Sequence, residues 1–181
     1  MLVLVVGPSG AGKDTLLEGV RTALKSDPTY VFVRREITRP AEAEDSIAID
    51  LETFLQRRDA GAYALSWQAH GHGYGISRAI DTYLQAGRVV VANVSRGVIE
   101  EAARRNRIRV VEISAPAAIL ADRLAARGRE TAAEVTARLL REAAVPGGVE
   151  LMRIVNDKTV AEGVRRLLDA ITAPAEFAPR S

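Results

Sequence analysis

The sequence predicts an α/β protein whose central sheet is mainly parallel and is flanked by helices. Three observations lead to this fold class. Short apolar runs rich in β-branched residues alternate with helix-like segments along most of the chain. The first run, Leu2 to Val6, leads directly into a glycine-rich turn and then into a helix. The length of 181 residues is enough for one domain with a single sizeable core.

The periodicity of apolar residues then gives each element in turn. After the strand at Leu2–Val6, the residues Leu16, Leu17 and Val20 recur at helical spacing from Lys13 onward. Ser114 to Pro116 mark the start of a later helix. We expect further strands at residues 88–94, 107–113 and 152–156, and further helices at 97–105, 117–127, 134–144 and 160–171.

One long segment interrupts this rhythm. Residues 34–84 are polar and contain several Gly, His and Tyr residues and the only Trp. We interpret this segment as an inserted substrate-binding lobe. A single domain then divides into a core (1–33, 85–125 and 150–172), the lobe (34–84), a lid (126–149) and a frayed tail (173–181).

Composition narrows the function classes. The absence of cysteine excludes disulfides, thiolate catalysis and Cys-based zinc sites. The apolar run at the N-terminus has no basic region before it and ends at Gly7, too early for a signal peptide or a membrane span, so we expect a cytoplasmic protein without membrane contacts. The net charge is only +2, and no basic run is interleaved with aromatic residues, which argues against nucleic-acid binding.

The turn after the first strand, "GPSGAGKDT", is nearly a P-loop, G-x-x-x-x-G-K-[ST]. Its glycines let backbone N–H groups converge on phosphate oxygens, and Lys13 adds positive charge at the β- and γ-phosphates. Thr15 can offer its hydroxyl to the α-phosphate. We therefore expect bound ATP with Mg²⁺, a catalytic role for Lys13, and nucleotide contacts from Gly7, Pro8, Ser9, Gly10, Ala11, Gly12, Lys13, Asp14 and Thr15.

The eighth motif position departs from the pattern, because Asp14 replaces the hydroxyl residue that ligates Mg²⁺. A carboxylate beside phosphates is repulsive unless a cation lies between them, and Mg²⁺ prefers oxygen ligands. Many P-loop enzymes place an Asp at the end of a neighbouring strand, where this chain has Asn93. We expect Asp14 and Asn93 to hold the metal. The alternative is that Asp14 only favours the first turn of its helix.

Arginines dominate the segment that follows the third predicted strand. "RLAARGRE" supplies Arg123, Arg127 and Arg129, and Arg138 and Arg141 share one face of the next predicted helix. Phosphoryl transfer needs cations around the transferring group, and a closing loop excludes water. We expect Arg123 and Arg127 at the nucleotide, Arg129, Arg138 and Arg141 at the acceptor, and catalytic roles for Arg127 and Arg138. The alternative is a solvated helical hairpin.

Three other stretches carry candidate ligands. "ITRP" supplies Arg39, with Glu44 after it, and "HGHGYG" supplies Tyr74, whose hydroxyl could reach a phosphate. The two histidines of "HGHGYG" lack a third metal ligand, so we favour substrate contact or a surface loop. Asn156 ends the last strand, where ligands bind in parallel sheets, and could hold a nucleotide base. Alternatively, Asn156 or Asp157 caps the following helix.

Taken in order, "GPSGAGK", "ITRP", "YG", "RLAARG" and "VND" resemble the guanylate kinase family over nearly the whole chain. "GKDT", "ALSWQAHGHGYG" and "NVSRG" are more similar to one branch, the ribose 1,5-bisphosphate phosphokinases of phosphonate degradation by the carbon–phosphorus lyase pathway. This resemblance implies a nucleoside-monophosphate-kinase-like fold. It also implies transfer of the ATP γ-phosphoryl group to ribose 1,5-bisphosphate, giving 5-phosphoribosyl 1-diphosphate.

The departures from guanylate kinases concern base recognition. That family places a serine where this chain has Arg35, and a guanine-binding glutamate at the position that aligns with Ser66. A base held by hydrogen bonds would lose its partners here, at a cost of orders of magnitude in selectivity. We expect Arg35, Arg39, Glu44, Ser66 and Tyr74 to bind a small phosphorylated sugar. The alternatives are a guanylate kinase and, in another class, a non-catalytic binding module of the same fold.

Overall fold

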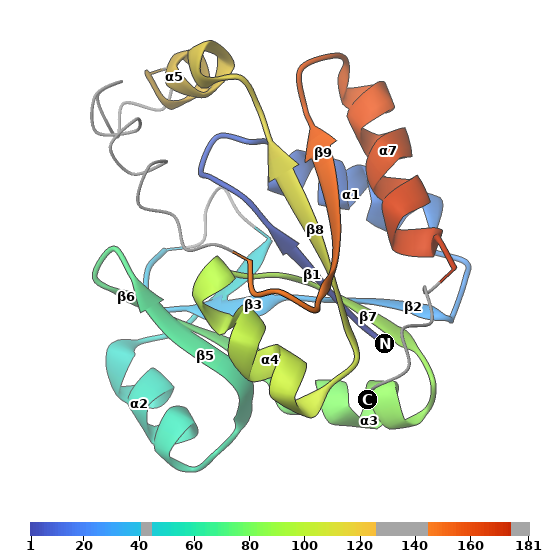
Figure 1. The fold of residues 1–181 in the computed structure, drawn as a ribbon. Coiled ribbons are helices and arrows are strands. Elements are labelled where there is room, and N and C mark those ends of the chain that lie inside the picture. The colour runs from blue at the N-terminus through green and yellow to red at the C-terminus, as the bar shows by residue number, and fades with distance from the viewer. Residues whose placement is uncertain (41–44, 126–144, 175–181) are drawn as a thin grey trace.

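The computed structural model describes residues 1–40, 45–125 and 145–174. Its centre is a five-stranded, fully parallel sheet in the order β2-β7-β1-β8-β9 (Figure 1). The strands are β1 (Leu2–Val6), β2 (Tyr30–Val33), β7 (Val89–Asn93), β8 (Ile108–Ser114) and β9 (Glu150–Val155). The predicted α/β class and its parallel sheet are therefore confirmed, and β2 is a strand that the sequence did not predict.

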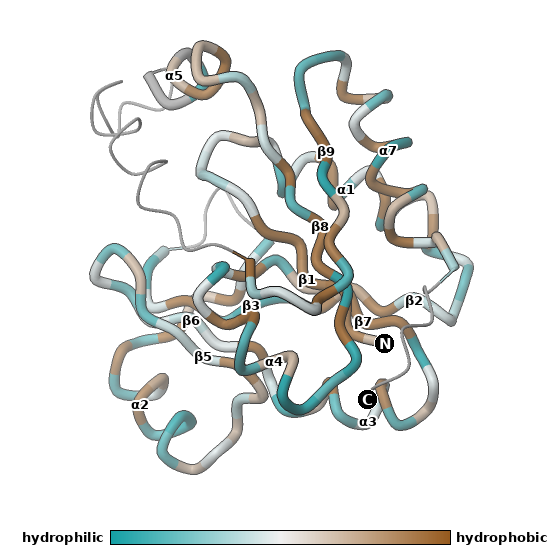
Figure 2. Tube along the Cα trace, in the orientation of Figure 1, coloured by the Kyte–Doolittle hydropathy of each residue, from teal (hydrophilic) through white to brown (hydrophobic). Residues whose placement is uncertain are grey.

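Helices cover both faces of this sheet. They bury β1 on both sides, since β1 is apolar in every position and its successive side chains point to opposite faces. Val3 and Val5 face α1 (Lys13–Ala23) and α7 (Val160–Thr172). Leu2, Leu4 and Val6 face the other layer, which contains α3 (Ile80–Gln85), the short 3₁₀ helix Arg96–Val98 and α4 (Ile99–Arg105). Figure 2 shows the result as apolar strands at the centre with polar segments around them. No helix in the described ranges is long and apolar enough to span a membrane.

The helix α5 (Ala117–Ala125) follows β8, as predicted, and starts at the expected residue. Its last two predicted residues, 126 and 127, and the whole helix expected at 134–144 lie outside the described residues. The final predicted helix is α7, which ends one residue later than expected.

Residues 35–77 build a second sheet, in the order β4-β3-β6-β5. Its strands are β3 (Arg35–Ile37), β4 (Ser46–Ala48), β5 (Tyr63–Ala69) and β6 (His72–Ser77), and α2 (Leu51–Asp59) packs on one face. On that face the rings of Phe54 and Tyr63 fill the space above two glycines of β6. A Cβ on Gly73 would lie 2.6 Å from the Phe54 ring, and one on Gly75 would lie 2.4 Å from the Tyr63 ring.

A buried arginine connects the first sheet to the end of α7. Arg109 of β8 is 0% exposed, and its Nε donates to Glu150 Oε1 over 2.7 Å. Its Nη1 donates to the carbonyls of Ala170 (3.0 Å) and Ala173 (2.8 Å), and Nη2 donates to Pro174 O (2.9 Å). A cation suits a helix C-terminus, where carbonyls lack helical partners. Arg109 thereby fixes the end of the last described helix against the sheet.

Candidate active site

The glycine-rich turn between β1 and α1 is shaped by contacts that only glycine permits. Gly7 has φ +143°, and a Cβ there would lie 2.0 Å from the carbonyl oxygen of Ile113 in β8. Gly12 precedes the first residue of α1 with φ +87°. Both values lie in the left-handed region that favours glycine. The loop can therefore lie against the ends of β1 and β8 with its backbone around the N-terminus of α1, the arrangement that binds phosphate.

Asn156 supports this loop from below, and this corrects the prediction that it holds a base. Its side chain is 6% exposed, and its Nδ2 donates to the carbonyl of Ala11 over 2.8 Å. The capping alternative is also wrong. The N-cap of α7 is Thr159, whose Oγ1 accepts from the backbone N–H of Glu162 at 3.2 Å. The side chain of Ala11 is fully buried, so Ala11 can contact a nucleotide only through its backbone.

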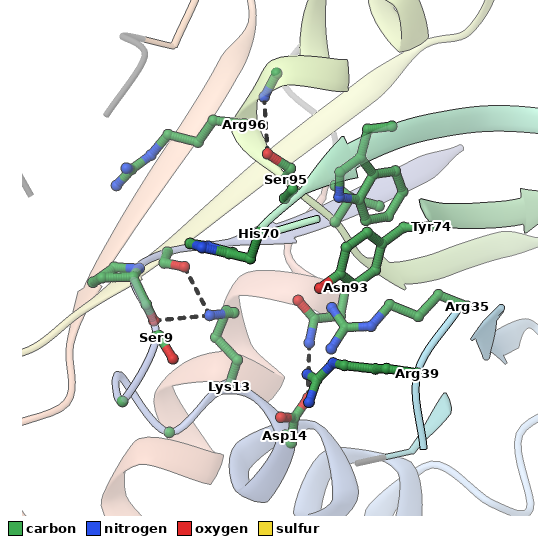
Figure 3. Close-up of a pocket in the computed structure, with 18 of the residues that line it drawn as sticks. Ser9, Lys13, Asp14, Arg35, Arg39, His70, Tyr74, Asn93, Ser95 and Arg96 are labelled. Carbon is green, nitrogen blue, oxygen red and sulfur yellow. Dashed lines mark hydrogen bonds between the residues drawn. The ribbon is translucent and has the colours of Figure 1, made fainter. Parts of the chain in front are cut away.

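A cavity of about 440 Å³ opens above the loop, at the carboxyl ends of the parallel strands (Figure 3). Three parts of the chain line it: the P-loop, the end of β7 with the residues that follow it, and one face of the second sheet with residues from β3, β5 and β6 and the segments next to them. Among the described residues, its lining cations are Lys13, Arg35, Arg39 and Arg96, and the one lining carboxylate is Asp14. A cavity with this excess of positive charge is suited to an anionic ligand.

On the P-loop side, the structure brings the predicted residues together. Lys13 Nζ donates to the carbonyls of Gly7 (2.7 Å) and Pro8 (2.8 Å), which holds the ammonium group at the mouth of the loop. Ser9 and Thr15 line the cavity. Arg123 lies against the loop, because its Nη1 donates to Gly10 O at 3.2 Å.

Asp14 and Asn93 meet at the floor of the cavity. The Asn93 Nδ2 donates to Asp14 Oδ1 over 2.8 Å, which joins the first turn of α1 to the end of β7. Asn93 Oδ1 is buried and has no hydrogen-bond partner within the described part of the chain. One carboxylate and one unsatisfied amide oxygen are donors that suit Mg²⁺, which usually completes its shell with phosphates and water. The described ranges hold no cluster of three or more His, Cys, Asp or Glu residues.

The second sheet contributes a stacked wall. The rings of Trp67 and Tyr74 lie 5.2 Å apart at an angle of 4°. The guanidinium of Arg35 lies 5.7 Å from the centre of the Tyr74 ring, and its Nε donates to Ser46 Oγ over 3.2 Å. Arg39 follows β3 and lines the same cavity. Arg35, Arg39 and Tyr74 thus line the cavity opposite the P-loop, and their binding of the acceptor stays a prediction.

Ser66 is not part of this arrangement. It pairs with Gly75 across the β5–β6 ladder, on the face covered by α2, whereas its neighbour Trp67 pairs with Tyr74 on the cavity side. The prediction that Ser66 binds the acceptor is therefore corrected. Glu44 and the arginines 127, 129, 138 and 141 lie outside the described residues.

Several lining residues were not predicted from the sequence. Arg96 comes from the turn after β7, and its Nη2 donates to Glu112 Oε1 over 2.6 Å. The position of Arg96 in the sequence could have indicated its role, because Arg96 closely follows a parallel strand and ligands bind at the carboxyl ends of such strands. The others are Trp67, Ala69, Val94, Ser95 and Gly97, and His70, for which substrate contact or a surface loop was expected, also lines the cavity.

Comparison with known proteins agrees with this geometry. A ribose 1,5-bisphosphate phosphokinase from Methylobacterium radiotolerans is 49% identical over 95% of this chain and 97% of that protein. A protein of the same name from Acidiphilium cryptum is 53% identical over 89% of this chain and 86% of its own length. The chain belongs to the ribose 1,5-bisphosphate phosphokinase family.

Two further comparisons place this phosphokinase family among related folds. A protein family described as an AAA domain matches residues 2–144. A guanylate kinase structure from Anaplasma phagocytophilum superposes with a TM-score of 0.68 over 96% of this chain and 85% of that one. Its sequence identity of 20% shows a shared fold only.

Proposed function

We propose that this phosphokinase transfers the γ-phosphoryl group of ATP to ribose 1,5-bisphosphate and forms 5-phosphoribosyl 1-diphosphate. The observation that carries the proposal is the pair Arg35 and Arg39, which face a P-loop across one cavity. Relatives that carry the name ribose 1,5-bisphosphate phosphokinase match nearly the whole chain. An acceptor with a phosphate at each end requires cations on the side opposite the nucleotide, and arginine binds phosphate oxygens in pairs.

ATP lies on the P-loop in this proposal. Backbone N–H groups from Ser9 to Lys13 and the Lys13 ammonium hold the β- and γ-phosphates. Asp14 and Asn93 would hold Mg²⁺, which would neutralise charge on the phosphates there. Lys13 already has its ammonium at the mouth of the loop, so a small movement of this flexible side chain brings it to a phosphate.

The acceptor lies against Arg35, Arg39 and Tyr74. Guanine bound as in guanylate kinases would need a carboxylate to accept hydrogen bonds from its N–H groups. The described second-sheet residues that line the cavity, Arg35, Arg39, Trp67, Ala69, His70 and Tyr74, include no carboxylate. A sugar bisphosphate therefore fits this wall better than a nucleoside monophosphate does.

The chemistry needs positioning more than proton transfer. An oxygen of the acceptor's 1-phosphate, already ionised, forms a bond to the γ-phosphorus, and the bond from that phosphorus to the β–γ bridging oxygen breaks, which releases ADP. Because the attacking oxygen carries no proton, no strong general base is required. Lys13 stabilises charge at the transferring group. We propose that Arg127 and Arg138 do so from the lid.

The test is a phosphoryl-transfer assay with ATP and Mg²⁺ against ribose 1,5-bisphosphate and GMP side by side. We expect ribose 1,5-bisphosphate to have the higher kcat/KM by orders of magnitude. A Lys13→Ala variant serves as the control, because it should lose activity with every acceptor and so locate the reaction at this loop. A higher kcat/KM for GMP would overturn the proposed acceptor.

A further inference from the structure

The hairpin between β5 and β6 contains an unusual backbone. Ala69 pairs with His72, so His70 and Gly71 form a two-residue turn. Their φ values are +52° and +75°, and His70 is the one non-glycine residue with positive φ in the described ranges. Two consecutive positive φ angles indicate a type I′ turn, in which the first position favours Asn, Asp or Gly. Histidine tolerates this conformation but is not the preferred residue.

The imidazole therefore does not follow from the needs of the turn. Asn-Gly is the commonest pair in such turns and would build the same hairpin with less strain. The side chain of His70 lines the cavity, and Figure 3 shows the ring directed from the hairpin toward the P-loop side. Strained backbone tends to be kept where the side chain has a function.

The surroundings of His70 define the chemistry of its partner. Of the residues that the structure describes, Lys13, Arg35, Arg39 and Arg96 line the same cavity with one carboxylate, Asp14. These cations attract anionic groups into the space that His70 faces. An imidazole supplies one N–H donor when neutral and two when protonated, so it can donate to a phosphate oxygen in either state.

We propose that His70 is a ligand-contacting residue that donates a hydrogen bond to a phosphate oxygen held between the P-loop and the second sheet. This inference rests on the proposed function for the identity of the phosphates. The phosphate belongs to the nucleotide or to the acceptor, and the experiment below separates the two. His70 thus adds a donor from the hairpin to those of the loop and of Arg35 and Arg39.

The chain offers a matched pair of variants, since it has only two histidines. His70→Asn keeps the type I′ turn and removes the imidazole. His72→Asn makes the same change on β6, at a residue that does not line the cavity. Losing a hydrogen bond to a charged group costs about tenfold to a hundredfold, so we expect that fall in kcat/KM for His70→Asn. We expect His72→Asn to stay within about twofold of the parent, and both variants to keep its melting temperature or exceed it.

Imidazole NMR on the untagged protein gives a readout independent of turnover. The His72→Asn spectrum assigns the two signals directly. Three samples contain a non-hydrolysable ATP analogue with Mg²⁺, ribose 1,5-bisphosphate, or both. We expect the His70 signal to move much more than the His72 signal, and the sample in which it first moves identifies which ligand supplies the phosphate.

Two results would overturn the role of His70. One is a His70→Asn variant whose kcat/KM matches that of His72→Asn, and the other is a His70 signal that moves no more than the His72 signal in every sample. Failure of the proposed function looks different. The parent enzyme would then not phosphorylate ribose 1,5-bisphosphate, and the sample with the ATP analogue would still decide whether His70 contacts phosphate.

Discussion

At the scale of single residues, two arginines that are adjacent in the sequence have different positions: one lines the cavity and the other lies on the surface. Arg35 lines the cavity beside Tyr74, while Arg34 does not line it and has a side chain that is 52% exposed. Arg34 donates to Ser46 O over 2.9 Å and pairs with Asp45 at 2.8 Å. The two side chains therefore share a local environment and a charge, but only one faces the proposed acceptor.

The first prediction compares Arg35→Ala with Arg34→Ala. Arg35→Ala should lower kcat/KM for the acceptor by about tenfold to a hundredfold, because a charge-assisted hydrogen bond to phosphate is lost. The KM for ATP should change little. Arg34→Ala should leave acceptor kinetics within about twofold of the parent. Steady-state assays at varied acceptor concentration check this, and equal losses in both variants would contradict a contact specific to Arg35.

The second prediction concerns Asp14 and Mg²⁺. Asp14→Ala should raise the Mg²⁺ concentration needed for half-maximal activity and lower kcat, because Asn93 alone remains of the two proposed ligands. Glu18→Ala, an exposed acid on the same helix, is the control and should leave the Mg²⁺ dependence unchanged. Activity is measured across a Mg²⁺ titration. An unaltered titration for Asp14→Ala would favour the simpler role of a helix-terminal acid.

Motif chemistry predicted where the P-loop residues lie, because strand, turn and helix dictate the course of that backbone. It failed for Asn156 and Ser66, whose side-chain directions depend on neighbours far away in the sequence. Asn156 is drawn under the loop by the carbonyl of Ala11, 145 residues earlier. Ser66 faces α2 because the pairing of β5 with β6 places Trp67 on the cavity side. No local pattern encodes either choice.

At the scale of elements, the contact of α2 with the second sheet depends on Tyr63. Its hydroxyl donates to Glu36 over 2.5 Å, and Arg57 of α2 pairs with the same carboxylate. Burial, and next the neighbouring Glu36 carboxylate, raise the pKa of the Tyr63 hydroxyl above its ordinary value. The ring and its hydroxyl thereby join β5, β3 and α2.

The third prediction follows from the sign of this pKa shift. In the unfolded chain Tyr63 ionises near pH 10, whereas in the folded protein it keeps its proton to higher pH. The unfolded state therefore binds fewer protons above that pH, and stability should fall as the pH rises past about 10. Tyr63→Phe should show a smaller fall between pH 9 and about 11. Urea unfolding of both proteins at each pH checks this, and parallel curves would refute it.

The same elements show why the second sheet escaped prediction. The strand β1 is apolar throughout and β7 is apolar up to Asn93, which is typical of parallel strands buried on both faces. In β6, glycines occupy the face toward α2, because Phe54 and Tyr63 fill that space from other elements. The usual alternation of apolar and polar residues is therefore absent from "HGHGYGIS", and the segment resembled a loop.

At the scale of the whole molecule, Arg109 carries a contact between the sheet and the end of α7. The fourth prediction is that Arg109→Ala lowers the free energy of unfolding by about 3–5 kcal/mol, because it leaves Glu150 and several helix-terminal carbonyls without their cation. Arg104→Ala is the control, since Arg104 is 70% exposed in an i,i+4 pair with Glu100 and should cost less than about 1 kcal/mol.

Urea unfolding of both variants at neutral pH tests this difference. The KM values of Arg109→Ala at a temperature where it is folded should match those of the parent, because Arg109 does not line the cavity. A loss no larger than that of Arg104→Ala would mean that the buried pair can be removed without penalty.

The position of β1 bears on how the chain is made by the ribosome. β1 is synthesised before the other strands that the structure describes, yet it lies in the middle of the sheet, where Leu2 pairs with Val90 on one side and Ile108 on the other. At a typical rate of about 5–20 residues per second, the ribosome needs roughly 5–20 s to proceed from β1 to the end of β8. For that time, a fully apolar strand lacks at least one of the two strands with which it pairs. We therefore expect nascent chains to need a holding chaperone during this interval.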